Sequence, residues 1–263
     1  MWRPVTPRTD VAVAVVDVHG GAWCDNDRRF GKRYDSKLAS HGAVVVAIDF
    51  RCGDTGPHPA GSTDVASAVR WVRANAVSLG IDPALVLTVG SSSGGHLAWL
   101  AALQPTHLPS VPLGELHIAG EWVADDGRGD ASVVGVAAFW PPVDPLARYR
   151  YARGLDTDHG RRLVSNTEAY FGTPDAMAEA SIAHVVASGH ASTLPPVLLV
   201  VPEHDRNVPP AITDEVAAVY SSSGGVVDVR DYPGVGHAFG HLDTEQTPVF
   251  EADLVSWVSS LVG

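Results

Sequence analysis

The sequence predicts an α/β fold in which a mostly parallel β-sheet is flanked by helices. Three observations support this prediction. Apolar runs rich in β-branched residues recur along the 263 residues, helix-like stretches separate them, and one apolar run passes through a Gly/Ser turn directly into a helix-like run. Alternation of strands and helices is typical of parallel sheets with right-handed crossover connections.

Six apolar runs are the predicted strands. They lie at 11–18, 43–49, 84–90, 133–140, 196–201 and 226–232. These runs are nearly continuous in apolar residues rather than alternating with polar ones. Strands of a parallel sheet are buried on both faces and show this continuous pattern. We therefore expect helices to cover both sides of the sheet.

Amphipathic patterns predict helices between these strands. A candidate N-cap, Ser62 or Thr63, is followed by apolar residues at helical spacing over 62–76. Further helix-like stretches lie at 96–103, 212–220 and 250–261. Because strand and helix alternate throughout, each helix is expected to connect two neighbouring parallel strands.

Two segments interrupt this alternation. Residues 104–131 are rich in Pro, Gly and Asp, which predicts a surface excursion. Residues 141–195 are too long for a bare connection between two strands, so we expect a small helical cap there. With this cap inserted, residues 1–263 form a single predicted domain.

The composition argues against several classes of protein. Lys and Arg number 18 and Asp and Glu 30, a net charge of −12, without a basic stripe for nucleic acid or an anionic membrane. Two cysteines, Cys24 and Cys52, favour free thiols over a single bridge. The apolar run 11–16 is too short for a signal peptide, and no stretch approaches the ~20 apolar residues of a membrane span. We expect a cytoplasmic protein.

The Gly/Ser turn carries the strongest functional signal. The apolar run 84–89 ends at Gly90, and the helix-like run begins at His96. Of the three serines between them, only Ser92 has glycines two positions away on both sides, Gly90 and Gly94. This G-x-S-x-G pattern between a strand and a helix is typical of a nucleophile elbow, a strained turn that exposes a serine. A flexible linker is the alternative, but linkers are not enclosed by strand and helix without a spacer.

An activated serine needs a histidine base and a carboxylate that orients the base. Asp205 follows the fifth predicted strand, and His237 lies in a Gly-rich loop after the sixth. The order serine, acid, histidine is the one found with nucleophile elbows, and all three follow strand ends, where catalytic groups of parallel sheets gather. The rival acids are Glu203 and Asp214, and the rival bases are His204 and His241.

The loop after the first predicted strand is the candidate oxyanion hole. It reads His19-Gly20-Gly21-Ala22-Trp23. Glycines let backbone N–H groups approach a substrate oxygen closely, so we assign the donors to Gly20 and Gly21, joined by the N–H of Ser93 after the nucleophile. An ordinary turn is the alternative for this loop taken alone.

Other residues carry weaker signals. Trp23, Tyr149, Tyr151 and Tyr170 are candidates for the walls of a substrate pocket, with packing or a solvated cap face as the alternatives. His96, at the start of the helix after the elbow, reads as a structural histidine. The twelve histidines show no metal-ligand spacing beside carboxylates, so we expect no metal site. The chemistry outlined for Ser92 needs no cofactor.

With these motifs the chain resembles the α/β-hydrolase superfamily, in particular its hormone-sensitive-lipase-like and kynurenine-formamidase-like carboxylesterases. The resemblance runs from about Val11 to the C-terminus and includes the 19–23 loop, Asp49-Phe50-Arg51, the 90–98 elbow and the loops at Asp205 and His237. It implies an α/β-hydrolase fold. Ala22 stands where the lipase branch often has a third glycine, which is closer to the formamidase type. Only ten residues precede the first strand, so the family's first two strands are expected to be reduced.

The resemblance implies a serine hydrolase that cleaves a small or medium carboxylic ester. Alternatives are an aryl-formamide amidase, an enzyme that uses the same triad for lactone chemistry, and a non-catalytic binding protein of the same fold. The expected partner is a small-molecule ester, with no nucleic acid or membrane. A reduced N-terminal region leaves one sheet edge open, which suggests a homodimer.

Overall fold

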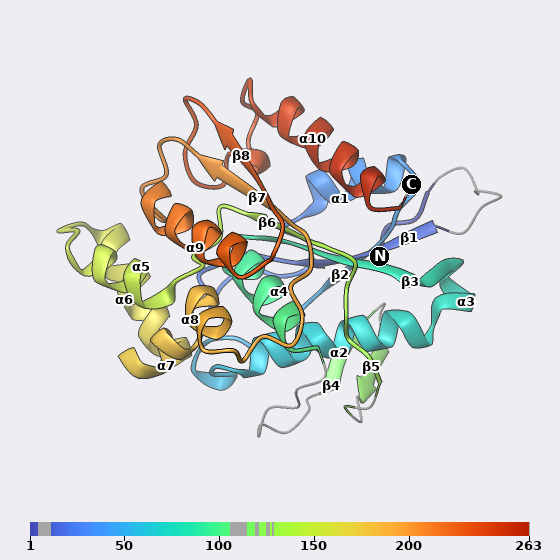
Figure 1. The fold of residues 1–263 in the computed structure, drawn as a ribbon, viewed down its shortest axis with the longest axis horizontal. Helices are drawn as coiled ribbons and strands as arrows, with labels where there is room; N and C mark the ends of the chain where they lie inside the picture. The colour runs from blue at the N-terminus through green and yellow to red at the C-terminus, as the bar shows by residue number, and fades with distance from the viewer. Residues whose placement is uncertain (5–11, 106–114, 119–120, 125–126, 128, 263) are drawn as a thin grey trace.

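The computed structural model describes residues 1–4, 12–105, 115–118, 121–124, 127 and 129–262 (Figure 1). Six strands form one parallel sheet in the order β2-β1-β3-β6-β7-β8. These strands are β1 (Ala12–Val18), β2 (Val44–Ile48), β3 (Ile81–Ser91), β6 (Val136–Phe139), β7 (Val197–Pro202) and β8 (Val227–Tyr232). All six predicted strands are therefore confirmed.

Strand β1 lies inside the sheet, between β2 and β3. Its residues alternate between the two faces: Val15 packs in one buried cluster and Val16 in the other. Both side chains are fully buried. This double burial is the reason why the sequence of β1 is continuously apolar up to Asp17.

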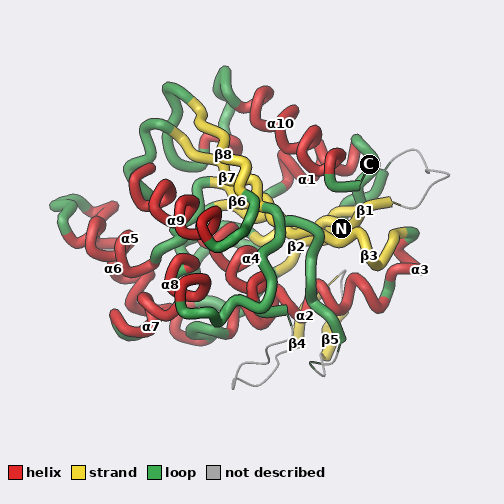
Figure 2. Tube along the Cα trace, viewed as in Figure 1, coloured by secondary structure: helices red, strands yellow, loops and turns green. Residues whose placement is uncertain are grey.

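Helices cover both faces of the sheet, as Figures 1 and 2 show. On one face lie α1 (Lys32–Ser40) and α10 (Thr247–Ser260), and on the other lie α2 (Ala60–Ala74), α4 (Ser93–Leu103) and α9 (Pro210–Ser222). Short helical turns, η1 (Gly53–Thr55) and α3 (Ala76–Leu79), flank α2. The chain is thus a three-layer α/β structure.

The segment 141–195 is helical, as predicted. It contains α5 (Pro145–Arg153), α6 (Asp158–Phe171), α7 (Pro174–Glu179) and α8 (Ile182–Ala187). Side chains cap the first three helices: Asp144, Thr157 and Thr173 each accept a hydrogen bond from the backbone N–H three residues later. Helices α5, α6 and α7 pack on one another beside the sheet in Figure 1, whereas α8 packs against α4 and α9.

Much of the predicted surface excursion 104–131 lies outside the described residues. Its described part includes β4 (Glu115–Ile118) and β5 (Glu121–Ala124), which form a separate antiparallel pair. Among the described helices, none is long and apolar enough to cross a membrane. Cys24 and Cys52 are free thiols, each partly buried.

Strand β2 is the sheet edge that the sequence predicts to be open. Trp2 pairs with it in an antiparallel bridge: Trp2 N–H donates to the Val45 carbonyl over 2.8 Å, and Val45 N–H donates to the Trp2 carbonyl over 3.0 Å. The edge is therefore covered at one point by the chain itself. A homodimer stays a prediction.

Helix α4 approaches the end of β1 closely at Gly94, and this contact generates a stability prediction. A Cβ at Gly94 would overlap the backbone carbonyls of Val18 and His19. We expect Gly94→Ala to lower the free energy of unfolding by about 3 kcal/mol or more. Gly154→Ala, at an exposed helix end with an ordinary negative φ of −77°, should change it by less than about 1 kcal/mol. Denaturant unfolding followed by circular dichroism measures both, and equal effects would contradict the prediction.

Candidate active site

Three side chains from three strand ends meet in one hydrogen-bonded chain. Ser92 follows β3, Asp205 follows β7 and His237 follows β8. His237 Nε2 lies 3.0 Å from Ser92 Oγ, and His237 Nδ1 lies 2.8 Å from Asp205 Oδ2. The structure thus brings together the three residues that the sequence predicts as nucleophile, base and acid.

Ser92 occupies a strained turn between β3 and α4. Its φ of 50° and ψ of −124° lie in a backbone region that residues other than glycine rarely adopt. The turn is held by the Ser92 N–H, which donates to the Phe139 carbonyl over 2.8 Å. This conformation lifts the hydroxyl out of the strand and points it at His237.

Asp205 is buried and oriented by its own loop. Its Oδ1 accepts hydrogen bonds from the N–H groups of Asn207 and Val208, each at 2.8 Å, which leaves Oδ2 to face His237. Because a carboxylate only accepts, His237 donates from Nδ1 and its Nε2 is free to accept the serine proton. The geometry therefore selects one tautomer of the neutral imidazole.

The rival residues lie elsewhere. Glu203 accepts a hydrogen bond from Gly234 N–H at the exposed side of its loop, and Asp214 is exposed on α9. The side chain of His204 is 63% exposed beside Glu203. His241 packs among aromatic rings, where burial lowers its pKa to about 4.

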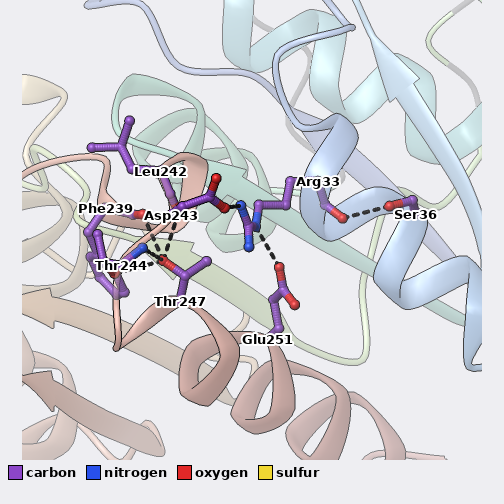
Figure 3. A network of polar contacts seen from close by, with 8 residues as sticks. All are labelled: Arg33, Ser36, Phe239, Leu242, Asp243, Thr244, Thr247 and Glu251. Carbon is purple, nitrogen blue, oxygen red and sulfur yellow. Dashed lines mark hydrogen bonds and ion pairs between the residues drawn. The ribbon is translucent and has the colours of Figure 1, made fainter.

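The loop that carries His237 is fastened at its far end. It continues into η2 (Phe239–His241), and Thr247 Oγ1, at the start of α10, donates to the Phe239 and Leu242 carbonyls. Figure 3 shows the adjacent ion pairs, in which Arg33 on α1 contacts Asp243 at 2.5 Å and Glu251 at 2.7 Å. These contacts join α1, α10 and the histidine loop.

The loop after β1 places the candidate oxyanion donors next to Ser92. A Cβ on Gly20 would lie 2.9 Å from the Ser91 carbonyl oxygen and 3.2 Å from Ser92 Cβ, so glycine allows the loop to approach the turn at Ser92 closely. The Gly20 carbonyl accepts hydrogen bonds from His19 Nδ1 at 2.8 Å and Asn26 Nδ2 at 3.2 Å. Since the C=O and N–H of a peptide point in opposite directions, these bonds turn the Gly21 N–H away from them. In the described loops, no backbone hydrogen bond uses the N–H of Gly20, Gly21 or Ser93.

The same loop is tied to the cap through Asp25. Its backbone N–H donates to the Gly21 carbonyl over 2.9 Å. Its Oδ2 accepts from Arg162 at 2.8 Å and from Asn166 at 3.0 Å, both on α6. The cap helix is therefore bonded directly to the turn that contains the candidate oxyanion hole.

A cavity of about 190 Å³ opens at Ser92 and His237. The cap contributes one face of α6, with residues at spacings of three and four: His159, Arg162, Leu163 and Asn166. The sequence reasoning missed these residues, although their helical spacing was the available signal. Ala22, Asn26, Phe30, Trp140 and Asn207 complete much of the wall.

The predicted pocket residues are not among the described residues that line this cavity, and the prediction is corrected accordingly. Trp23 is fully buried, with its indole N–H donating to His96 Nδ1 over 3.3 Å. Tyr170 is buried, and its hydroxyl accepts from Gly61 N–H. Tyr149 binds Glu168, and Tyr151 donates to the Arg206 carbonyl. The three tyrosine hydroxyls and the Trp23 indole N–H all have partners within the fold, and none of these four side chains lines the Ser92 cavity.

The residues that the structure describes contain no group of three His, Cys, Asp or Glu side chains that could hold a metal ion. The groups that the structure brings together at this site are Ser92, His237, Asp205 and the nearby backbone N–H groups. Such an arrangement can activate a hydroxyl for attack on a carbonyl carbon and can stabilise the resulting oxyanion.

Known proteins resemble this chain in sequence. A family model described as BD-FAE matches residues 3–219. The esterase LipC of Mycobacterium tuberculosis is 28% identical over 255 residues, which cover 94% of this chain and 58% of LipC. The carboxylesterase NlhH of the same species is 34% identical over 116 residues, covering 43% of this chain and 35% of NlhH. The chain thus spans little more than half of the first relative and about a third of the second.

Solved structures share the fold. The esterase Est2 of Thermogutta terrifontis, with propionate bound, aligns with a TM-score of 0.72 at 24% identity, over 99% of this chain and 87% of Est2. An esterase of Pyrobaculum calidifontis aligns with a TM-score of 0.73 at 23% identity, over 97% and 79% of the two chains. At these identities the similarity shows the fold, and it confirms the predicted α/β-hydrolase architecture.

His96 supports this site as a neutral residue, and this generates a pH prediction. It accepts from Trp23 and donates from Nε2 to the Ala180 carbonyl at 2.8 Å, and burial lowers its pKa to about 4. An unfolded histidine titrates near 6.5, so between about pH 6.5 and 4 the unfolded chain binds one more proton at this residue than the folded one. The contribution of His96 to stability is therefore complete above about pH 6.5 and declines as the pH falls towards 4.

Replacement of His96 by glutamine, which can still donate to Ala180, removes this titration. We expect the unfolding free energy of His96→Gln to depend less steeply on pH across this window, by up to about 1.4 kcal/mol per pH unit. Other buried groups, including His58, His241 and Asp35, titrate in both proteins and cancel in the difference. Denaturant unfolding at several pH values measures the two slopes, and parallel lines would rule out this role.

Proposed function

Because the chain belongs to the BD-FAE family of α/β-hydrolases, we propose that it is a serine esterase that cleaves a small or medium carboxylic ester through an acyl-enzyme. The observation that carries the proposal is the hydrogen-bonded chain from Ser92 through His237 to Asp205. A binding protein has no need for a strained serine aligned with an oriented histidine and a buried carboxylate. The esterase names of its relatives point in the same direction.

The proposed reaction begins with proton transfer from Ser92 Oγ to His237 Nε2 as the serine attacks the ester carbonyl. The imidazolium that forms is stabilised by Asp205. His237 then gives the proton to the leaving alcohol, which leaves the acyl group on Ser92. Water repeats the sequence on the acyl-enzyme and releases the acid.

The N–H groups of Gly20, Gly21 and Ser93 are the proposed donors to the tetrahedral oxyanion. Ser93 is the first residue of α4, so its N–H has no partner inside the helix and lies at the positive end of the helix dipole. The bonds from His19 and Asn26 to the Gly20 carbonyl hold the neighbouring peptide in place before substrate binds. This preorganisation is the usual source of oxyanion stabilisation.

The cavity supports a substrate of limited size. Its volume of about 190 Å³ is below the ~300–1,000 Å³ of typical small-molecule sites. Polar side chains on α6 share its wall with Leu163, Trp140 and Phe30. We therefore expect short acyl esters to be turned over faster than long ones.

We expect Ser92→Ala to abolish turnover, by about 10⁴-fold or more in kcat, while the fold is retained. p-Nitrophenyl acetate, butyrate and octanoate, beside an aryl formamide, measure the activity and separate ester from amide chemistry. A fluorophosphonate probe should label wild type and Ser91→Ala but not Ser92→Ala. Labelling that survives in Ser92→Ala would disprove the assignment, and formamide turnover without ester turnover would replace esterase by amidase.

His237→Ala should lower kcat nearly as far as Ser92→Ala, because the serine then has no base. Asp205→Asn should lower kcat by about 10²-fold or more, since an amide can hold His237 in the wrong tautomer. Members of a triad act as a unit, so the double variant that combines His237→Ala with Asp205→Asn should be little slower than His237→Ala alone. Steady-state kinetics of the three variants test this, and losses that simply multiply would argue against one connected unit.

A further inference from the structure

Arg148 on α5 is a buried cation without a polar partner. Only 1% of the residue is exposed. Its Nε and Nη1 atoms are enclosed and have no hydrogen-bond partner, and no carboxylate of the described residues forms an ion pair with it. Burial lowers the pKa of the guanidinium to about 10, so Arg148 remains charged at neutral pH.

Such an arrangement is costly for folding. A charge taken out of water without a counterion destabilises the folded state, and an apolar side chain of similar size is often the more stable choice. The only close partner described for the guanidinium is the Trp23 ring, whose centroid lies 5.0 Å from Arg148 Cζ. Buried groups that violate the usual rules of stability are commonly found where function requires them.

Trp23 connects the charge of Arg148 to the loop that carries the proposed oxyanion donors. Trp23 lies two residues after Gly21, in the loop that carries the proposed oxyanion donors. Arg148 therefore contacts this loop through the Trp23 ring, and it is not among the described residues that line the Ser92 cavity. Because it is almost wholly enclosed, a substrate group cannot reach it, and any effect on the reaction has to be carried by its field.

The nearby acidic groups do not neutralise the positive charge of Arg148. Asp25 is paired with Arg162, and Asp205 is paired with His237. Cys24 lies near the guanidinium, but burial raises the pKa of its thiol to about 11, so the thiol is neutral. The field also reaches the cavity: the pKa of His159, which lines it, is lowered by burial, by His237 and then by Arg148.

We propose that Arg148 is a positioning residue for catalysis: its buried, unneutralised positive charge, which contacts the Gly20–Gly21 loop through Trp23, stabilises the oxyanion of the transition state. The sign is the required one for the carbonyl oxygen, where negative charge develops during attack by Ser92, whereas the positive charge that forms on His237 is compensated by its own partner, Asp205. The proposal rests on the esterase function proposed above. The expected effect is about tenfold in rate, which corresponds to about 1.4 kcal/mol of transition-state stabilisation.

The test is a comparison of Arg148→Met with wild type. Methionine keeps much of the volume and removes the charge. We expect kcat on p-nitrophenyl butyrate to fall about tenfold with KM changed less than about twofold, while Tm rises by about 3 °C or more. Arg150→Met, an exposed position on the same helix, is the matched control and should change neither quantity.

Opposite signs of the two effects identify the role, because a merely structural arginine would lose activity and stability together. Unchanged kcat, or a joint fall of kcat and Tm, overturns the proposal. Arg148→Gln serves if the methionine variant does not fold, and failure of both variants to fold also overturns it. NMR titration provides a second readout: loss of the charge should raise the pKa of His159, and an unchanged value would contradict a field that reaches the cavity.

This design separates the inference from the function on which it rests. If wild type hydrolyses none of the esters, the esterase proposal fails, and the proposed role of Arg148 in ester cleavage fails with it. If wild type is active and Arg148→Met is equally active, only the role of Arg148 is lost.

Discussion

The close contact between the start of α4 and the end of β1 is the constraint on which the rest of the site depends. Val18 pairs with Gly90 across the two strands, and Gly94 then packs against the Val18 carbonyl. This contact brings the elbow and the Gly20 loop within one van der Waals layer of each other. The candidate nucleophile and the proposed oxyanion donors are therefore positioned by the sheet and not by flexible loops.

The remaining groups reach the same place because the sheet is parallel. The carboxyl ends of β3, β7 and β8 lie on the same side of the sheet, so Ser92, Asp205 and His237 meet there although 145 residues separate the first from the last. Buried hydrogen bonds then fix each loop separately: the Asp205 loop through its own N–H groups, and the His237 loop through Thr247. The strand ends bring the three side chains together, and the hydrogen bonds within each loop then fix their positions.

Sequence reasoning recovered the features that local patterns encode. The continuous apolar runs located all six strands, and glycine spacing distinguished Ser92 from two adjacent serines. It did not anticipate α1, where Lys32, Arg33 and Lys37 mask a short buried face formed by Tyr34, Leu38 and Ala39. It also chose Trp23 and three tyrosines of the cap as pocket walls, because the orientation of a cap helix depends on tertiary contacts such as Asp25 with Asn166. The pairing of Trp2 with Val45 is likewise a long-range contact without a local signal.

Helix α6 of the cap lines the cavity and is also hydrogen-bonded to the loop that carries the proposed oxyanion donors. Helix α6 supplies the cavity wall through His159, Arg162 and Leu163, and the same helix holds Asp25, whose backbone closes the turn at Gly21. A shift of α6 that enlarges the cavity would therefore also move the proposed oxyanion donors. For the proposed esterase, a cap fastened in this way is expected to favour a narrow range of substrates, because the geometry that accepts a larger acyl group is not the geometry that aligns the Gly21 N–H, a proposed donor, with the oxyanion.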